Sequence, residues 1–290
     1  MNQFAIITDS GADLPQYLAE ELDVSVLPLH FTIQGKEYAD HPDRRDMDPH
    51  ELYELLRHGE MGKTSALNAN DYVELMEPML EAGQDILVIT FSSGLSTTYQ
   101  SSVIAVEEMK EKFPERKIYT VDTLAASLGQ GLLVWHACQQ RTEGKSIEEV
   151  RDWLEDHKLN LAHWFTVDDL NHLKRGGRVS AATALVGTML SIKPVLHVDD
   201  EGHLISMSKA RGRAASLKAL VDKMEEDAID PASQTVFISH GDSEADARKV
   251  ADLVKDRFGV EVKVIDYVGP VIGCHAGPGV IALFYLGRKR

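Results

Sequence analysis

Residues 86–96 read ILVITFSSGLS, an apolar run that passes directly into a serine-rich segment. A short continuous apolar run that ends at polar residues is typical of a strand buried on both faces of a sheet. A helix is predicted to follow over residues 97–112. The stretch therefore predicts a strand, a loop and a helix in order, which is the repeating unit of an α/β protein.

The same order recurs on both sides of this stretch. Further strands are predicted at residues 4–7, 24–29 and 117–121, and further helices at residues 14–22, 49–57, 70–80 and 125–141. Strands that alternate with helices form a mainly parallel sheet covered on both faces, and such sheets bind ligands beyond the carboxyl ends of their strands. The N-terminal half is therefore predicted to be a Rossmann-like α/β domain.

The pattern changes after an amphipathic helix predicted at residues 146–157. Residues 195–206 look like a β-hairpin whose turn is Asp200-Glu201-Gly202, so antiparallel pairing enters the fold. Strands are predicted at residues 162–167, 235–239, 260–267 and 280–286, and helices at residues 213–224 and 243–258. We predict two domains: residues 1–158, an α/β domain, and residues 159–290, an α+β domain with a mixed sheet.

Composition excludes several classes of protein. The chain has 290 residues, 43% of them hydrophobic, which is enough to bury a large core. A net charge of −16 disfavours nucleic acid and anionic membranes as partners. Two cysteines cannot form a disulfide framework, and no apolar run approaches the ~20 residues of a membrane span. We expect a cytoplasmic protein without stable membrane insertion.

Two hydroxyl-rich segments are candidates for an anion site. The first contains Thr64 and Ser65, and the second, between a strand and a helix, contains Ser93, Gly94 and Ser96. Hydroxyls beside a helix N-terminus can hold a carboxylate or a phosphate, but they can equally well serve only as helix caps. The GKT sequence at residues 62–64 lacks the first glycine and the preceding strand of a nucleotide-binding loop, so we exclude that function.

A histidine and a basic segment add to these candidates. His275 lies in GCHAGPG, residues 273–279, which predicts a tight loop holding the imidazole for either a structural or a functional role. Arg175 and Arg178 flank a glycine pair in a locally positive region that suits either solvent or an acidic or phosphorylated partner. No pair of histidines has metal-ligand spacing, so no metal site is predicted.

Together these segments resemble the bacterial DegV family, fatty-acid-binding proteins that serve as carrier subunits of fatty-acid kinase. The resemblance covers nearly the whole chain. The matching segments are residues 7–10 (ITDS), 64–65 (TS), 92–96 (SSGLS), 98–101 (TYQS), 167–170 (VDDL), 174–178 (KRGGR), 192–196 (IKPVL) and 275–279 (HAGPG).

The resemblance implies a carrier that encloses a long-chain fatty acid and has no turnover or cofactor of its own. By the same resemblance, Thr64, Ser65 and Ser96 hold the carboxylate with His275 nearby, and Ser93 and Gly94 support them. A dihydroxyacetone-kinase-like partner would phosphorylate the bound acid to an acyl phosphate for phospholipid synthesis. Arg175 and Arg178 would serve kinase docking or phosphoryl transfer, and the tract 179–190 would contribute to the tail tunnel.

Two other functions stay open at this point. A serine hydrolase acting on acyl substrates would use Ser93 or Ser96 as nucleophile, His275 as base and Asp122 to orient it, although the chain has no G-x-S-x-G elbow. A regulatory or scaffold protein would instead bind a partner through its basic segment without any small ligand.

Overall fold

The computed structural model describes residues 4–179 and 192–290. Its first sheet has the strand order β2-β1-β6-β7 with all strands parallel. The strands are β1 (Phe4–Asp9), β2 (Val24–Leu27), β6 (Asp85–Thr90) and β7 (Ile118–Asp122). The central strands are almost completely buried because helices cover both faces of the sheet, as the continuous apolar runs predict.

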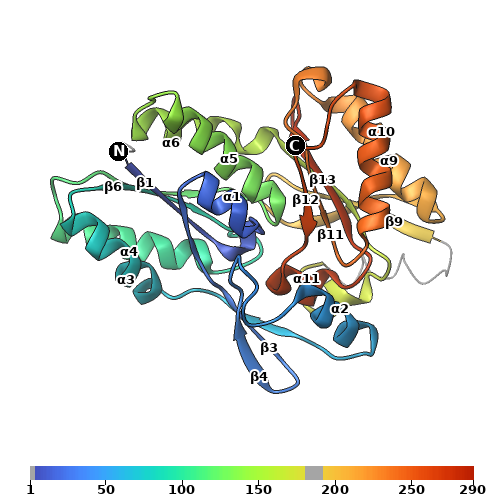
Figure 1. Ribbon diagram of the computed structural model, residues 1–290, viewed down its shortest axis with the longest axis horizontal. Coiled ribbons are helices and arrows are strands. Elements are labelled where there is room, and N and C mark those ends of the chain that lie inside the picture. Colours follow the sequence, from blue (N-terminus) through green and yellow to red (C-terminus); the bar gives the residue numbers. More distant parts are fainter. Residues whose placement is uncertain (1–3, 180–191) are drawn as a thin grey trace.

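Two pairs of helices cover this sheet on opposite faces (Figure 1). One pair is α3 (Ala69–Glu81) and α4 (Thr98–Lys112), and the other is α5 (Leu128–Thr142) and α6 (Ile147–His157). A capping box between Ser146 and Glu149 begins α6. Helix α5 is buried on nearly all sides because it lies between the first sheet and a second one.

The second sheet is mixed, with the order β10-β9-β8-β13-β11-β12. Its strands are β8 (Leu161–Thr166), β9 (Ile192–Val198), β10 (Leu204–Arg211), β11 (Phe237–His240), β12 (Val264–Tyr267) and β13 (Ile281–Leu286). The predicted hairpin is confirmed as β9 and β10. Helices α9 (Arg213–Asp227) and α10 (Glu244–Phe258) cover the outer face, whereas the inner face meets α5 (Figure 1).

A small antiparallel sheet, which the sequence did not predict, lies beside the first one, with the order β4-β3-β5. Its strands are β3 (His30–Ile33), β4 (Lys36–Ala39) and β5 (Lys63–Ser65). The remaining helices are α1 (Gln16–Glu21), α2 (Pro49–Arg57), α7 (Asn171–Arg175) and α11 (Pro270–Ala276), and short 3-10 turns span Ser10–Ala12, Lys158–Asn160 and Pro231–Ser233. Helix α11 contacts α2, β3 and β5, which ties the two ends of the chain together.

The predicted fold class, a parallel α/β sheet followed by a mixed sheet, is confirmed. The predicted domain boundary after residue 158 falls in the 3-10 turn between α6 and β8. The division into two domains stays a prediction, because α5 contacts the second sheet and α11 contacts elements of the first half. In the described part of the chain, no helix combines the length and apolar character needed to cross a bilayer.

Candidate functional site

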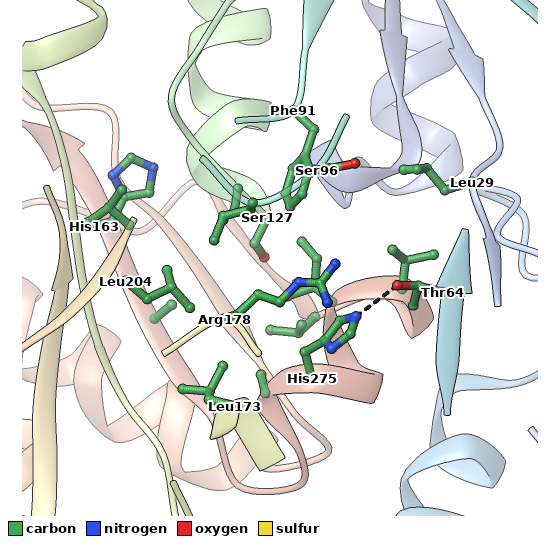
Figure 2. Close-up of a pocket in the computed structure, with 18 of the residues that line it drawn as sticks. Leu29, Thr64, Phe91, Ser96, Ser127, His163, Leu173, Arg178, Leu204 and His275 are labelled. Atoms are coloured by element: carbon green, nitrogen blue, oxygen red, sulfur yellow. Dashed lines mark hydrogen bonds between the residues drawn. The ribbon is translucent and has the colours of Figure 1, made fainter. Parts of the chain in front are cut away.

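A cavity of about 490 Å³ lies between the two sheets, beyond the carboxyl ends of β6 and β7, and Figure 2 shows the side chains that line it. This volume falls within the range of small-molecule binding sites in proteins. Residues from both halves of the chain line it, including Leu29 and Phe91 from the first half and Phe165, Val198 and Phe284 from the second. The site is therefore built only when the two sheets come together.

The inner wall of the cavity is one face of the second sheet. Ala282 in β13 pairs with Phe165 in β8 and with Ser239 in β11, so these side chains share a face. Phe284, two residues further along β13, lies on that face as well and also lines the cavity. This wall is mostly apolar and buried, so it offers contacts to an apolar group more readily than to a polar one.

The opposite end of the cavity reaches the protein surface. Four of the lining residues there are exposed: Ser65, Ala66, Thr97 and Gln100. Thr64 and Ser96, both partly buried, line the cavity beside them. The cavity thus has a polar mouth of hydroxyl and amide groups and an apolar interior.

Thr64 and His275, which lie more than 200 residues apart in sequence, meet at this mouth. Thr64 Oγ1 lies 2.8 Å from His275 Nε2 (Figure 2). Thr64 belongs to β5 and His275 to the last turn of α11, so the tight loop expected around His275 is a helix as far as Ala276. The two elements fit closely, since a Cβ atom on Gly62 would lie 2.1 Å from Cys274 Sγ.

The His275 imidazole is neutral near pH 7. Burial, and secondarily the nearby Arg178 charge, lower its pKa to about 4. A neutral imidazole carries one N–H, and if Nε2 carries it, His275 donates to Thr64 and leaves the Thr64 hydroxyl hydrogen free for a ligand. Nδ1 is buried without a hydrogen-bond partner, facing Gly176, where a Cβ would come within 2.2 Å. The glycine in KRGGR therefore makes room for the imidazole.

The serine-rich segment is held from several sides. Asp9, at the end of β1, accepts a hydrogen bond from the Phe91 amide at 2.9 Å, and Asp122, at the end of β7, accepts one from the Ser93 amide at 3.2 Å. Gly94 lies against the turn of the β9–β10 hairpin, since a Cβ there would lie 2.6 Å from the Glu201 carbonyl oxygen. Gly94 does not line the cavity, but it lets this segment approach the second sheet.

Ser93 and Ser96 both line the cavity, and Ser96 also serves the helix that follows. The Ser96 hydroxyl shares a hydrogen bond with the Thr98 hydroxyl at 2.8 Å and accepts one from the Thr98 amide at 3.2 Å. Ser96 therefore hydrogen-bonds to the first residue of α4 and also lines the cavity, so a structural role does not exclude contact with a ligand.

The two arginines of the basic segment have different surroundings. Arg178 is half-buried, lines the cavity and lies beside His275 (Figure 2), and burial lowers its pKa from the ordinary value. Among the described lining residues it is the only one with a formal charge at neutral pH. Arg175 is exposed outside the cavity and contacts His172 at 3.1 Å. The tract 180–191 lies outside the described residues.

Sequence reasoning missed the polar groups of the inner cavity. Ser127 and Ser239 both line it, with their hydroxyl oxygens 3.0 Å apart, and Ser127 also donates to the buried Asp13. Ser127 has a φ of 56°, a conformation that non-glycine residues seldom adopt. No sequence pattern marks these residues, because only the packing of α5 on β11 brings them together.

The residues of the hydrolase alternative do not form a catalytic triad in the described structure. His275 Nε2 contacts Thr64, and its Nδ1 faces Gly176 instead of a carboxylate. Asp122 accepts hydrogen bonds from the backbone amides of Ser93 and Leu124. A serine hydrolase needs a nucleophile that hydrogen-bonds to a base, and a base that hydrogen-bonds to an acid. The geometry of these residues therefore does not support the hydrolase alternative.

Within residues 4–179 and 192–290, one group of side chains has the spacing of metal ligands, and none of its members lines the cavity. Ligand atoms of His50, Glu54 and Asp242 lie within 4.8 Å of one another. Arg57 already forms ion pairs with both Glu54 and Asp242, so a cation occupies this acidic position. The group is thus accounted for as an ion-pair cluster between α2 and the segment after β11.

Comparison with known proteins identifies the family of this chain. The DegV family model matches residues 3–288. A DegV domain-containing protein of Clostridium perfringens is 47% identical, covering 100% of this chain and 99% of the relative. A Thermus thermophilus DegV family protein, described as binding fatty acid, is 30% identical with a TM-score of 0.87, covering 98% of this chain and 99% of that one.

A second solved structure agrees with the first. DegV of Bacillus subtilis, described as a fatty-acid-binding protein, is 27% identical with a TM-score of 0.83 and covers 99% of this chain and 100% of its own. The family match, the identity to the Clostridium relative and the shared fold agree over the full length, as the residue segments predicted. The chain belongs to the DegV family.

Proposed function

We propose that this protein binds one long-chain fatty acid, with the carboxylate at the polar mouth and the tail in the apolar interior. The observation that carries the proposal is a single cavity that combines an apolar inner wall with hydroxyls and one positive charge at its surface end. Each enclosed methylene contributes about 0.8 kcal/mol, so the tail supplies affinity while the mouth fixes orientation. The names of the Thermus and Bacillus proteins support the same ligand class.

In this proposal, Thr64, Ser65 and Ser96 donate hydrogen bonds to the carboxylate, and Arg178 neutralises its charge. His275 stays neutral and orients the Thr64 hydroxyl through their 2.8 Å contact. Ser93 and Gly94 support the serine-rich segment from behind. Charge-assisted hydrogen bonds of this kind are stronger than neutral ones, which suits a site that must hold one end of a flexible ligand.

The exposed mouth suits a carrier that presents the carboxylate to a second protein. We infer that a dihydroxyacetone-kinase-like fatty-acid kinase phosphorylates the bound acid to an acyl phosphate for phospholipid synthesis. This protein would then have no turnover of its own. Arg175, exposed beside the mouth-lining Arg178, is the candidate contact for the kinase.

The direct test is to identify what the protein carries. We expect solvent extraction of the purified protein, followed by mass spectrometry, to release about one equivalent of a long-chain fatty acid, since the apolar interior would otherwise be hydrated. Protein stripped of lipid should bind added palmitic acid in a titration. Absence of lipid after purification, together with no binding of added acid, would remove the carrier function.

A second prediction tests the hydroxyl at the mouth. Replacing Thr64 by Val keeps the shape of the side chain and deletes its hydroxyl, so affinity for palmitic acid should fall about tenfold. Thr64→Ser, the matched control, should keep affinity within about threefold because it retains the donor. Ser96→Ala should lose less than Thr64→Val, because the Ser96 hydroxyl is already engaged with Thr98. Equal affinity of the Val and Ser variants would place the carboxylate elsewhere.

A further inference from the structure

His163 is a polar side chain built into the otherwise apolar inner wall of the cavity. It belongs to β8, is 2% exposed and lines the cavity. It pairs with Phe284 of the neighbouring strand β13, and the two rings meet edge to face with their centres 5.7 Å apart. An apolar residue would be the ordinary choice at a position surrounded in this way.

The surrounding elements fix the His163 ring in place. A Cβ atom on Gly129 in α5 would lie 2.6 Å from His163 Nε2, so the ring lies directly against the helix backbone. Burial, and secondarily the charge of Arg290, lower its pKa well below the ordinary value, against a weaker opposite effect of the Leu161 backbone. The ring is therefore neutral at pH 7 and offers one donor and one acceptor.

Neither ring nitrogen of His163 has a well-aligned hydrogen-bond partner among the described residues, and the Leu161 backbone acts on the ring only as a weak acceptor. The other polar groups of the inner wall differ in this respect, because Ser127 and Ser239 hydrogen-bond to each other. The neighbouring histidine of β9, His197, donates through Nδ1 to the His163 carbonyl oxygen at 3.0 Å, so one of its two ring nitrogens is paired and only Nε2 is left without a partner in the described part of the chain. Leaving a buried donor or acceptor unpaired is costly, so a polar group with no partner beside a ligand cavity points to a partner on the ligand.

We propose that His163 is a specificity-determining residue that hydrogen-bonds an oxygen atom on the tail of the ligand, so that the protein prefers long-chain fatty acids hydroxylated far from the carboxylate. The inference rests on the proposed function and adds the class of acid. In Figure 2, His163 and Thr64 lie on opposite sides of the cavity, which puts the oxygen in the distal part of the chain. A hydroxyl suits a neutral imidazole in either tautomer, because it both donates and accepts.

The test is a titration of the lipid-free protein with palmitic acid and with its isomers carrying one hydroxyl at successive carbons. We expect the isomers with the hydroxyl at one distal region to bind about tenfold more tightly than those with it elsewhere in the tail. His163→Leu should abolish this preference and bind palmitic acid at least as tightly as the wild type. His163→Gln, which keeps a donor and an acceptor, should retain part of the preference.

Ser239→Ala is the matched control, because it deletes a cavity hydroxyl that already has a partner, and it should keep the positional preference. Equal affinity of the wild type for all isomers, with palmitic acid bound normally, would overturn the role of His163 and leave the proposed function intact. A preference that survives in folded His163→Leu would overturn it as well. Failure to bind any of the acids would instead remove the proposed function. If the Leu variant does not fold, the wild-type and Gln profiles decide the question.

Discussion

Replacing Arg178 by Glu should weaken the binding of palmitic acid about 200-fold, the largest loss that we expect from a single change at the mouth. Arg178 is half-buried and is the one formally charged side chain among the described lining residues. Its loss leaves the carboxylate without a counter-charge, and a glutamate adds repulsion where water screens little. The measurement is a fatty-acid titration of the lipid-free protein.

Arg175→Glu is the matched control for this charge reversal. Arg175 lies three residues earlier in the same basic segment, but it is exposed and contacts His172 instead of the cavity. Lipid affinity of this variant should stay within about twofold of the wild type, because an exposed charge outside the cavity is screened. Formation of acyl phosphate with the partner kinase should slow. Equal losses of lipid affinity in both variants would contradict this division of roles.

The structure therefore changes what the basic segment is expected to do. By the family resemblance, Arg175 and Arg178 together were expected to serve kinase docking or phosphoryl transfer. Burial separates them, because the chain turns at Gly177, where φ is 71°, and carries Arg178 into the cavity. Arg178 now joins the proposed carboxylate site, whereas Arg175 keeps the proposed role at the kinase surface.

Replacing Ala282 by Phe should shorten the acid that the protein accepts. Ala282 is 6% exposed and lies on the inner wall between Phe165 and Ser239. A phenyl ring there would displace roughly three or four methylenes, at about 0.8 kcal/mol each, so the affinity for stearic acid should fall about 100-fold. Decanoic acid, whose shorter tail avoids the blocked part, should bind nearly as it does to the wild type.

Ala282→Val provides a graded comparison for this prediction. It adds two carbon atoms at the same position and should cost stearic acid only about fourfold in affinity. Binding is measured with a series of saturated acids from decanoic to stearic acid, and thermal unfolding checks that each variant folds. A loss that is the same for every chain length would mean that Ala282 does not contact the tail.

The sequence predicts the structure most accurately where the structure depends on neighbouring residues. Helix α2 spans residues 49–57 as predicted, because Asp48 caps its first turn and Pro49 begins it. The hairpin at residues 195–206 was also predicted correctly, since its turn contains the Gly202 that adopts a φ of 80°. The tight loop expected at residues 273–279 was wrong for residues 273–276, which belong to α11, whereas residues 277–279 do form a turn with positive φ at Gly277 and Gly279.

The small antiparallel sheet shows why part of the site escaped prediction. β5 has three residues, too few for an alternating pattern of apolar and polar residues. It forms because its backbone pairs with the neighbouring strand β3. That pairing directs Thr64 toward His275. Because Thr64 and His275 lie so far apart in the sequence, no rule of residue spacing could have predicted their contact.

The amino-acid sequence by itself determined the order of strands and helices in the two large sheets and their covering layers, the family and the chemistry available at Thr64, Ser96 and His275, because these depend on local patterns and on residue identity. The tertiary structure alone decided which side chains share one cavity. It brought Arg178 inside and left Arg175 outside, and it enclosed His163 without a partner. The physical reason is that burial and hydrogen-bond partnership depend on how two sheets and α5 pack together, and packing joins residues that no local pattern connects.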